Sequence, residues 1–320
     1  MRAVQIKGGG HTEVIETPEP TPAVGEIPVR VAYAAVCSTD RKLLTQDLGE
    51  PRIPGHEVAG YLDDGSAVGL HPDIGCGSCS FCKSGLENRC PQRVSIGLDR
   101  DGGFAEVLTA PAGHVQALRG VDVTLGPLLE PLACCVHAVQ RIGVRDNDVA
   151  VVVGAGPMGI LAMWTLQAHG ARVGMCQRSV KRRTLAGELG ADAAFGPEDD
   201  PTRALGATPR VAVVTAPGTE ALTWSLQTVE VGGVVHAFAG SPGGAAVDAN
   251  LIHYRHLRLV GSTGSGREDY VRALDLVARD RVPLDAMPRR TVALDQVPDE
   301  LRDTTAPALK TVVEVGGKRP

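Results

Sequence analysis

Short apolar runs and amphipathic segments alternate through the middle of the chain. Val149–Val153 is an uninterrupted apolar run, which predicts a buried strand, and Met158–His169 has the apolar spacing of a helix. Thr219–Val229 predicts a second helix, and the polar link Gly196–Pro209 predicts only a reduced one. Four further runs predict strands like the first: Arg172–Cys176, Val211–Val214, Gly233–Phe238 and Leu257–Val260. This alternation is typical of a parallel sheet covered by helices.

The two ends of the chain have shorter strands and more turns than the middle. Met1–Lys7 and Val29–Ala35 predict strands, and the proline-rich segment Thr17–Pro28 predicts an extended connector between them. Glu268–Arg279 is amphipathic and is expected to lead the chain back to this first domain. A closing strand and a tail are expected after it, over Thr311–Val315 and Gly316–Pro320. The ends therefore predict a β-rich, barrel-like domain.

The first strand of the middle region runs directly into a glycine-rich turn, AVVVGAGPMG. Gly154, Gly156 and Gly159 have the spacing G-x-G-x-x-G, which suits a tight turn, a close approach of backbone to pyrophosphate, and close helix–strand packing. A helix that begins near Pro157 and Met158 directs its first N–H groups at the phosphates. The turn therefore predicts a dinucleotide site. The alternative is a glycine-rich turn that binds nothing.

The end of the second strand bears on the choice of coenzyme. An acidic residue at this place binds the ribose hydroxyls of NAD, but here the place falls on Gln177, followed by Arg178, Ser179 and Arg182. A neutral side chain beside arginines accepts a 2′-phosphate, which a carboxylate repels. The sequence therefore favours NADP(H) over NAD(H). The alternative is that Lys181–Arg183 is only the solvated face of the next helix.

Four cysteines in a short polar loop are the strongest metal signal in the chain. Their spacing is C-x2-C-x2-C-x7-C, over Cys76, Cys79, Cys82 and Cys90. Four thiolates make a closed tetrahedral Zn²⁺ site whose role is structural, and an iron–sulfur cluster is the alternative. The other cysteines in apolar patterns are expected in the core: Cys134, Cys135 and Cys176.

A second, more scattered set of side chains suits a metal ion as well. Cys37 follows a predicted strand, His56 and Glu57 stand in Gly-His-Glu, and Glu130 precedes the α/β region. Thiolate, imidazole and carboxylate are all ligands of Zn²⁺. Taken singly, none of these residues is specific for a metal, because Cys37 and His56 also suit core positions and Glu130 suits a helix N-terminus.

The amino-acid composition bears on which partners and substrates the protein is expected to bind. The formal net charge is -5 over 320 residues, which gives no reason to expect nucleic acid or an anionic membrane as partner. There is no apolar run of about 18 residues, as a membrane-spanning helix requires, and the N-terminus lacks the apolar core of a signal peptide. The protein is expected in the cytoplasm. Aromatic residues are 3% of the chain, which favours a small hydroxylated substrate over a bulky apolar one.

Taken in order, these motifs resemble the zinc-dependent medium-chain dehydrogenase/reductase family, closest to its polyol (sorbitol-type) and threonine dehydrogenase branch. The matching segments are Cys37–Asp40, Gly55–Glu57, the four-cysteine loop, Asp101–Glu106, Glu130–Ala133 and the Gly154 turn. The resemblance implies a GroES-like catalytic domain from both chain ends, over 1–130 and 265–320. It implies a Rossmann domain over 131–264, and relatives are commonly homodimers or homotetramers.

The resemblance also implies roles for individual residues. Cys37 and His56 match the family's catalytic zinc ligands, and Glu57 and Glu130 match carboxylates that complete the set directly or through water. Thr39 matches the hydroxyl of a proton relay. Two zinc ions per chain follow, one catalytic and one held by the four cysteines.

The sequence departs from the family pattern at two places. Lys42 stands near the position of a histidine that extends the relay in some relatives. Only Val58–Leu70 separates Gly-His-Glu from the cysteine loop, without the usual Gly-Asp pair, so the hairpin expected there is left open.

The expected function is hydride transfer between NADP(H) and a secondary alcohol or ketone of a polyol, sugar or cyclitol. Zinc supplies Lewis-acid chemistry in such an enzyme, and the nicotinamide accepts the hydride. Three alternatives stand beside it: an NAD-dependent threonine-type amino-alcohol dehydrogenase, a zinc-free reductase of the same superfamily, and a non-catalytic nucleotide-binding protein.

Overall fold

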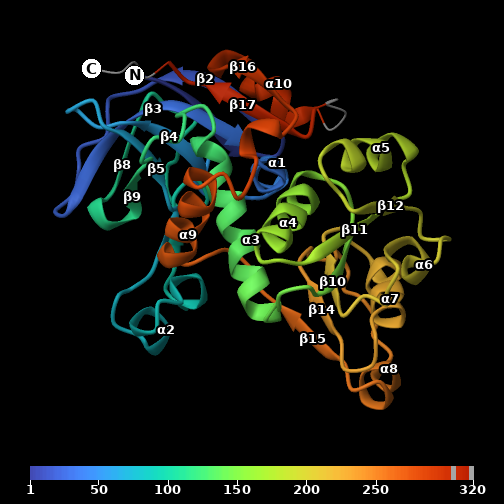
Figure 1. The fold of residues 1–320 in the computed structure, drawn as a ribbon. Coiled ribbons are helices and arrows are strands. Elements are labelled where there is room, and N and C mark those ends of the chain that lie inside the picture. The colour runs from blue at the N-terminus through green and yellow to red at the C-terminus, as the bar shows by residue number, and fades with distance from the viewer. Residues whose placement is uncertain (304–307, 317–320) are drawn as a thin grey trace. The chain divides into compact units, whose positions relative to one another are not determined.

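The computed structural model describes residues 1–303 and 308–316, which form two compact units. The first unit contains Met1–Ala133, Ser265–Ala278 and the described residues from Met287 on, and the second contains Cys134–Gly264 and Arg279–Ala286. In Figure 1 the blue and red ends of the chain contribute strands to the same unit.

A seven-stranded sheet organises the first unit, in the order β16-β17-β3-β4-β5-β9 with β8 also paired to β3. Its strands are β3 (Glu26–Val36), β4 (Glu57–Tyr61), β5 (Ala67–Leu70), β8 (Val107–Pro111), β9 (Val115–Ala117), β16 (Arg289–Ala293) and β17 (Lys310–Glu314). The predicted closing strand is present as β17, antiparallel to β3 with Thr311 opposite Val36. The parallel neighbour β16 was not predicted.

Smaller elements complete the first unit. The helices are α1 (Ser38–Thr45), α2 (Ser80–Lys83), α9 (Arg267–Ala278) and α10 (Val297–Arg302), with 3-10 turns η1 (Glu87–Arg89), η2 (Ala112–His114), η3 (Gly126–Leu128) and η5 (Leu294–Gln296). Two strand pairs are separate from the main sheet: β1 (Arg2–Gly8) with β2 (His11–Glu16), and β6 (Asp73–Ile74) with β7 (Val94–Ser95).

The connector before β3 is shorter than predicted. Glu26–Pro28, placed in the connector by its prolines, pairs with β8 from Glu26 opposite Pro111 to Pro28 opposite Thr109. Long-range pairing therefore extends the strand beyond the apolar run. Of the predicted tail, only Gly316 lies within the described residues.

The hairpin that the sequence left open is intact. β4 and β5 pair from Ala59 opposite Gly69 to Tyr61 opposite Ala67. Between them a tight turn is closed by the Leu62 N–H, which donates to the Ser66 carbonyl at 3.0 Å. A different turn thus replaces the Gly-Asp pair of the family pattern without loss of the strand pairing.

The second unit is a six-stranded parallel sheet in the order β12-β11-β10-β13-β14-β15. Its strands are β10 (Val149–Val153), β11 (Arg172–Cys176), β12 (Ala193–Phe195), β13 (Val211–Val214), β14 (Val234–Ala237) and β15 (Arg258–Gly261). Read in chain order, the sheet is 3-2-1-4-5-6, the doubly wound order of dinucleotide-binding folds. The order reverses between β10 and β13.

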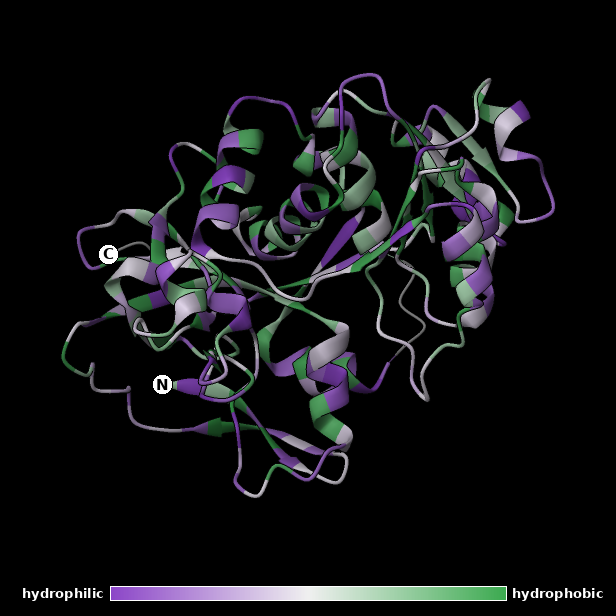
Figure 2. Cartoon of the chain, turned by 90° about the horizontal axis from the view of Figure 1, so that it is seen from below, coloured by the Kyte–Doolittle hydropathy of each residue, from purple (hydrophilic) through white to green (hydrophobic). Residues whose placement is uncertain are grey.

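Helices cover this sheet, and most helices of the chain show mixed hydrophobic and hydrophilic colours in Figure 2, whereas α4 (Pro157–Ala168) is apolar and buried along most of its length. The helices of this unit are α4, α5 (Val180–Glu188), α6 (Pro201–Leu205), α7 (Thr219–Thr228) and α8 (Ala249–Tyr254), with η4 (Leu284–Ala286); α3 (Leu129–Ile142) begins in the first unit and ends in the second. No helix among the described residues is long and apolar enough to cross a membrane.

The predicted strands of this unit are present within one residue at each end, and α6 has the small size expected. The three-residue strand β12 was not predicted, because so short a run has no detectable period. Arg279–Ala286 packs with the second unit, although the sequence placed 265–320 in the first domain. The Arg281 guanidinium holds it there by donating to the Ala168 carbonyl at 2.6 Å.

Candidate metal sites and nucleotide-binding turn

The scattered Cys-His-Glu set of the first unit comes together in the fold. Cys37 caps the start of α1 directly after β3, and Glu57 begins β4 opposite Ala35 of β3. This antiparallel register brings both residues, together with His56, to one end of the strand pair. Ligand atoms of Cys37, His56 and Glu57 all lie within 4.8 Å of one another.

Asp40 contacts Cys37 and His56 on the side away from the donor atoms' meeting point. The sequence alone had predicted no role for this residue. It is fully buried, and its carboxylate accepts the N–H of Cys37 at 2.8 Å and that of Gly55 at 3.3 Å. The His56 Nδ1 lies 3.3 Å from the same carboxylate. A carboxylate on one ring nitrogen fixes the imidazole so that the other nitrogen can bind a metal. Its position one helical turn after Cys37 was the available signal.

Charged neighbours also shift the pKa of His56. Burial lowers the pKa of His56, but the Asp40 carboxylate and the Cys37 thiol outweigh it and raise the pKa well above its ordinary value. The ring therefore lies in a field that favours a positive charge. A metal cation beside the ring satisfies the same field.

Lys310 is the second residue that sequence reasoning missed. Because Thr311 lies opposite Val36, the preceding Lys310 reaches the end of β3 beside Cys37. Its Nζ lies 2.6 Å from Oε1 and 2.5 Å from Oε2 of Glu57, and both side chains are buried. Burial lowers the pKa of Lys310, but Glu57 and Cys37 raise it by more, so the amine stays charged. Its only sequence signal was a lysine at the start of an apolar strand.

Glu130 and Thr39 lie close to this centre but outside the donor set. Glu130 is half-buried in the first turn of α3 and does not belong to the three-residue donor group of the described chain. Its charge nevertheless contributes to the raised pKa of Lys310. The Thr39 hydroxyl lies 3.7 Å from the Cys37 sulfur. Lys42, where some relatives have a relay histidine, is exposed.

The donor set fits a zinc ion. Zn²⁺ binds thiolate, imidazole and carboxylate at about 2.0–2.3 Å, which places tetrahedral ligands about 3.6 Å apart. Three donors within 4.8 Å of one another can surround such an ion with small side-chain adjustments. They also leave a fourth position for a substrate, as catalytic zinc sites do.

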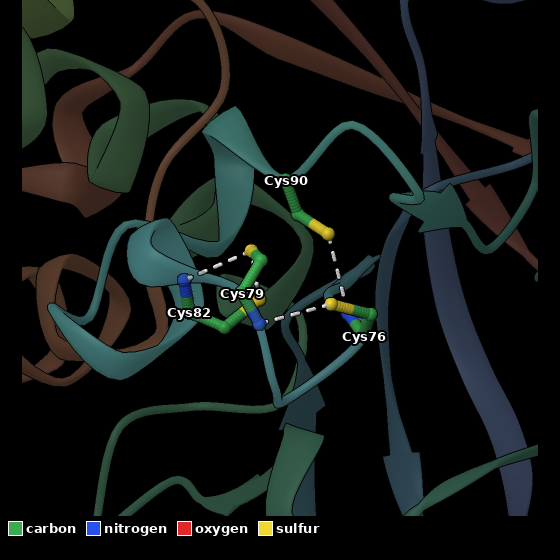
Figure 3. Close-up of side chains that lie close together, drawn as sticks. All are labelled: Cys76, Cys79, Cys82 and Cys90. Atoms are coloured by element: carbon green, nitrogen blue, oxygen red, sulfur yellow. Dashed lines mark hydrogen bonds between the residues drawn. The ribbon is translucent and has the colours of Figure 1, made fainter.

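The four loop cysteines converge as their spacing predicts, with their sulfurs turned toward one another in Figure 3. Backbone N–H groups of the loop donate to the sulfurs, including that of Cys79 to Cys76 at 3.4 Å and that of Cys76 to Cys90 at 3.3 Å. A Cβ added at Gly75 would lie 2.6 Å from the Cys82 sulfur, so only glycine fits beside the cluster.

The pKa values of these cysteines indicate that the four-thiolate form needs a bound cation. Hydrogen bonds from Ser78 and its neighbours lower the pKa of Cys76 to about 5, whereas desolvation and the adjoining thiols raise the pKa of Cys82 to about 12. Four thiolates cannot coexist at this distance unless a metal compensates their charge. The cluster therefore fits a tetrahedral metal with no open position.

The remaining cysteines are largely core residues, as expected. Cys135 and Cys176 are buried and Cys134 is half-buried. Desolvation by burial raises the pKa of Cys176 to about 12, which keeps this thiol unreactive.

Each glycine of the Gly154 turn has a distinct steric environment. Gly154 has φ +107°, and a Cβ there would lie 2.8 Å from the Thr215 hydroxyl, while a Cβ on Gly159 would lie 1.9 Å from the Gly154 carbonyl. A Cβ on Gly156 meets nothing within 4 Å. The first and third glycines are therefore required by packing, and the second faces open space where a phosphate can approach. The helix α4 begins at Pro157 without a side-chain cap.

A cavity of about 520 Å³ lies beside this turn in the second unit. Gln177 and Arg178 line it, together with Gly154, Cys176, the segment Ala216–Ala221 and Trp224. Ser179 and Arg182, predicted at the same site, are not among its lining residues. The Ser179 hydroxyl caps α5, and the Arg182 guanidinium donates to the Ala155 carbonyl at 3.0 Å within the glycine turn.

The other two cations of the basic cluster, Arg183 and Lys181, do not line the cavity. Arg183 donates to the Gln177 carbonyl at 3.4 Å and pairs with Glu198 at 3.5 Å. Lys181 is exposed. The solvated-face interpretation therefore applies to Lys181, whereas Arg178 alone of these cations reaches the cavity.

Two family models of known proteins match this chain, one in its N-terminal part and one in its middle part. The family model for the alcohol dehydrogenase GroES-like domain matches residues 23–119, and that for zinc-binding dehydrogenases matches residues 157–279. The D-altritol 5-dehydrogenase of Agrobacterium fabrum is 32% identical, over 83% of this chain and 85% of that protein. The L-threonine 3-dehydrogenase of Pyrococcus horikoshii is 30% identical, over 82% of each.

Solved structures share the fold over almost the whole chain. A Sinorhizobium meliloti structure bound to NADP superposes with a TM-score of 0.89 at 28% identity, covering 98% of this chain and 99% of that one. An Escherichia coli alcohol dehydrogenase complexed with NADH has a TM-score of 0.91 at 22% identity and the same coverage, which shows a common fold. With its GroES-like and Rossmann units, the chain belongs to the zinc-dependent medium-chain dehydrogenase/reductase family.

Proposed function

We propose that this protein is a zinc-dependent dehydrogenase that transfers hydride between NADP(H) and a secondary alcohol or ketone of a polyol, sugar or cyclitol. The observation that carries the proposal is the Cys37–His56–Glu57 donor set with Asp40 behind it. Only a metal-dependent reaction needs this set in addition to a nucleotide turn. A zinc-free reductase or a non-catalytic nucleotide-binding protein has no use for it.

In this mechanism Cys37 and His56 would hold the catalytic zinc, with Glu57 as the third donor, and the ion would supply Lewis-acid polarisation of the substrate oxygen. Asp40 keeps the His56 ring oriented toward the metal. The Thr39 hydroxyl, beside Cys37, receives the proton of the substrate hydroxyl and passes it outward. Lys310 neutralises Glu57 and limits the negative charge around the metal.

We assign a structural zinc to Cys76, Cys79, Cys82 and Cys90. The converging sulfurs and the glycine beside them support a closed site, and the zinc-binding family favours zinc over an iron–sulfur cluster. Two zinc ions per chain follow. Metal analysis of the purified protein tests this number directly.

The preference for NADP(H) rests on the cavity beside the glycine turn. Arg178 lines it as the cation available for a 2′-phosphate, and Gln177 replaces the carboxylate that would repel that group. The NADP bound to the Sinorhizobium structure supports this assignment. The second candidate is an NAD-dependent threonine-type dehydrogenase, which the similarity to the Pyrococcus enzyme favours.

A small polyhydroxylated substrate is supported by the altritol dehydrogenase relative. The test is turnover of zinc-loaded protein with NADP⁺ and NAD⁺ across polyols, sugars, cyclitols and threonine, with Cys37→Ala as the inactive control. Activity with a polyol and NADP⁺ supports the proposal, and activity only with threonine and NAD⁺ supports the second candidate. If no substrate is converted in either direction by fully zinc-loaded protein, the enzymatic proposal is wrong.

We propose further that the protein acts as a cytoplasmic homodimer or homotetramer, without nucleic acid or membrane partners. The edge strand β15 supports the oligomer, because within residues 1–303 and 308–316 it pairs only with β14, and it carries the half-buried residues Leu259 and Val260. An unpaired edge of this kind accepts a strand from a second copy. Light scattering of the zinc-loaded protein measures the mass of the particle in solution, which distinguishes a monomer from a dimer or tetramer.

A further inference from the structure

We propose that Ser262 binds the nicotinamide half of the coenzyme, and that His236 is a positioning residue that turns the Ser262 hydroxyl into a hydrogen-bond donor for it. The inference rests on the proposed coenzyme function and adds two residues to it. Neither residue belongs to the glycine turn, the metal sites or the cavity beside them.

His236 is a polar residue in an apolar strand. It is the third residue of β14, between Val213 of β13 and Val260 of β15, and it is fully buried. One of its ring nitrogens, Nε2, lies 3.0 Å from the Ser262 hydroxyl oxygen. The other, Nδ1, has no hydrogen-bond partner among the described residues.

The ring is neutral, and its surroundings select one tautomer. Burial and the nearby His137 and Arg141 lower the pKa of His236 to about 4. A neutral imidazole carries one N–H, and a buried N–H without an acceptor is costly. The proton therefore lies on Nε2 and is donated to the Ser262 oxygen. Because that oxygen already accepts from His236, the Ser262 hydroxyl proton is free for another acceptor.

The position of Ser262 in the sheet indicates which group accepts its hydroxyl proton. It follows β15 directly, at the carboxyl end of the parallel sheet, and it is half-buried. In a doubly wound sheet each half binds one mononucleotide of a dinucleotide, across the carboxyl ends of the strands. Gln177 and Arg178 place the adenosine at the β10–β11 half. The nicotinamide mononucleotide therefore lies over β13, β14 and β15, where Ser262 presents its hydroxyl to an oxygen of that half.

The experiment compares two ligands that differ by the nicotinamide mononucleotide half. Dissociation constants are measured by titration calorimetry for NADPH and for adenosine 2′,5′-bisphosphate; NADH and AMP replace them if the parent protein prefers the unphosphorylated pair. Loss of one neutral hydrogen bond weakens binding about 3- to 10-fold. Ser262→Ala is expected to weaken NADPH binding by that factor and to leave the binding of adenosine 2′,5′-bisphosphate unchanged.

His236→Phe keeps a buried ring but removes the donor, so it is expected to weaken NADPH binding without affecting the shorter ligand. The double variant is expected to be no weaker than Ser262→Ala, because both changes remove the same contact. His236→Gln, which retains an N–H donor, is expected to restore part of the affinity. As the matched control, Arg178→Gln weakens both phosphorylated ligands equally.

The outcomes separate this inference from the proposed function. Equal loss of both ligands in Ser262→Ala would show a general effect on the fold and overturn the inference. Unchanged NADPH affinity in Ser262→Ala would overturn it as well, while the coenzyme function stands. If the parent protein binds neither member of either ligand pair, the proposed coenzyme function itself is wrong.

Discussion

Replacing Lys310 with methionine tests the ion pair behind the candidate catalytic site. Methionine keeps the length and apolar stem of the side chain but removes its charge. Glu57, of which only 1% is exposed, then loses its cationic partner. In the metal-free protein nothing else in the donor set compensates that carboxylate except the neighbouring histidine.

The magnitude follows from the burial of both partners. Removing one partner from a buried ion pair costs about 3–5 kcal/mol, because the other charge stays buried and unpaired. In a unit of this size each kcal/mol lowers the melting temperature by about 2–4 °C. Metal-free Lys310→Met is therefore expected to melt about 10 °C below the metal-free parent protein. With zinc bound, the cation beside Glu57 offsets part of the lost charge, and the decrease is expected to be smaller.

The assay is thermal unfolding of parent and variant, each with zinc and after chelation. The matched control is Arg210→Met, which breaks the buried pair with Asp148 in the second unit. Its decrease in melting temperature is expected to be the same with and without zinc. Lys310→Arg, which keeps the charge, is expected to restore part of the stability.

Two results would refute this reasoning. One is a metal-free Lys310→Met protein that melts within about 2 °C of the parent, a shift that corresponds to less than about 1 kcal/mol. The other is a decrease for Lys310→Met that is equally large with and without zinc. Either would mean that Lys310 does not balance the charge of Glu57 at the metal site.

Three further predictions concern the other sites. Cys37→Ala is expected to abolish turnover at an unchanged melting temperature, and Cys79→Ala to lower that temperature; equal values for Cys79→Ala and the parent would contradict the structural assignment. Gly156→Ala is expected to weaken coenzyme binding about tenfold or more with the fold intact, because pyrophosphate approaches there, whereas Gly159→Ala strains the turn and lowers the melting temperature as well. Burial and nearby positive charges lower the pKa of His114 to about 4, so the unfolded chain binds a proton below about pH 6.5 before the folded one does, and stability falls from there to about pH 4. His114→Gln is expected to remove on the order of 2–3 kcal/mol of that loss in urea unfolding, and an identical pH dependence in both proteins would disprove it.

Local patterns in the sequence were sufficient for the features whose residues are close together along the chain. The strand–turn–helix at Gly154 and the four-cysteine loop depend on spacing within a few residues, and both have the predicted geometry. Five of the six strands of the parallel sheet were predicted as well, because strands buried on both faces read as continuous apolar runs, whereas β12 has only three residues. The family resemblance then joined these local motifs into one architecture.

The tertiary structure alone decided the features that depend on strand register. Lys310 and Glu57 are 253 positions apart, and they meet because β17 pairs with β3 and β3 with β4. A shift of β17 by one residue would turn Lys310 to the other face of the sheet. Sequence spacing carries no information about such a register.

The same distinction applies to the basic cluster after β11. In the sequence, Arg178 and Arg182 are equally suited to a phosphate. In the fold, Arg178 lines the cavity, whereas Arg182 donates to the Ala155 carbonyl. Charge and spacing in the sequence thus determined that cations gather near the nucleotide turn. Only the packing of α5 against that turn decided which of them faces a ligand, because a side chain's direction is set by the backbone that carries it and by the groups it contacts.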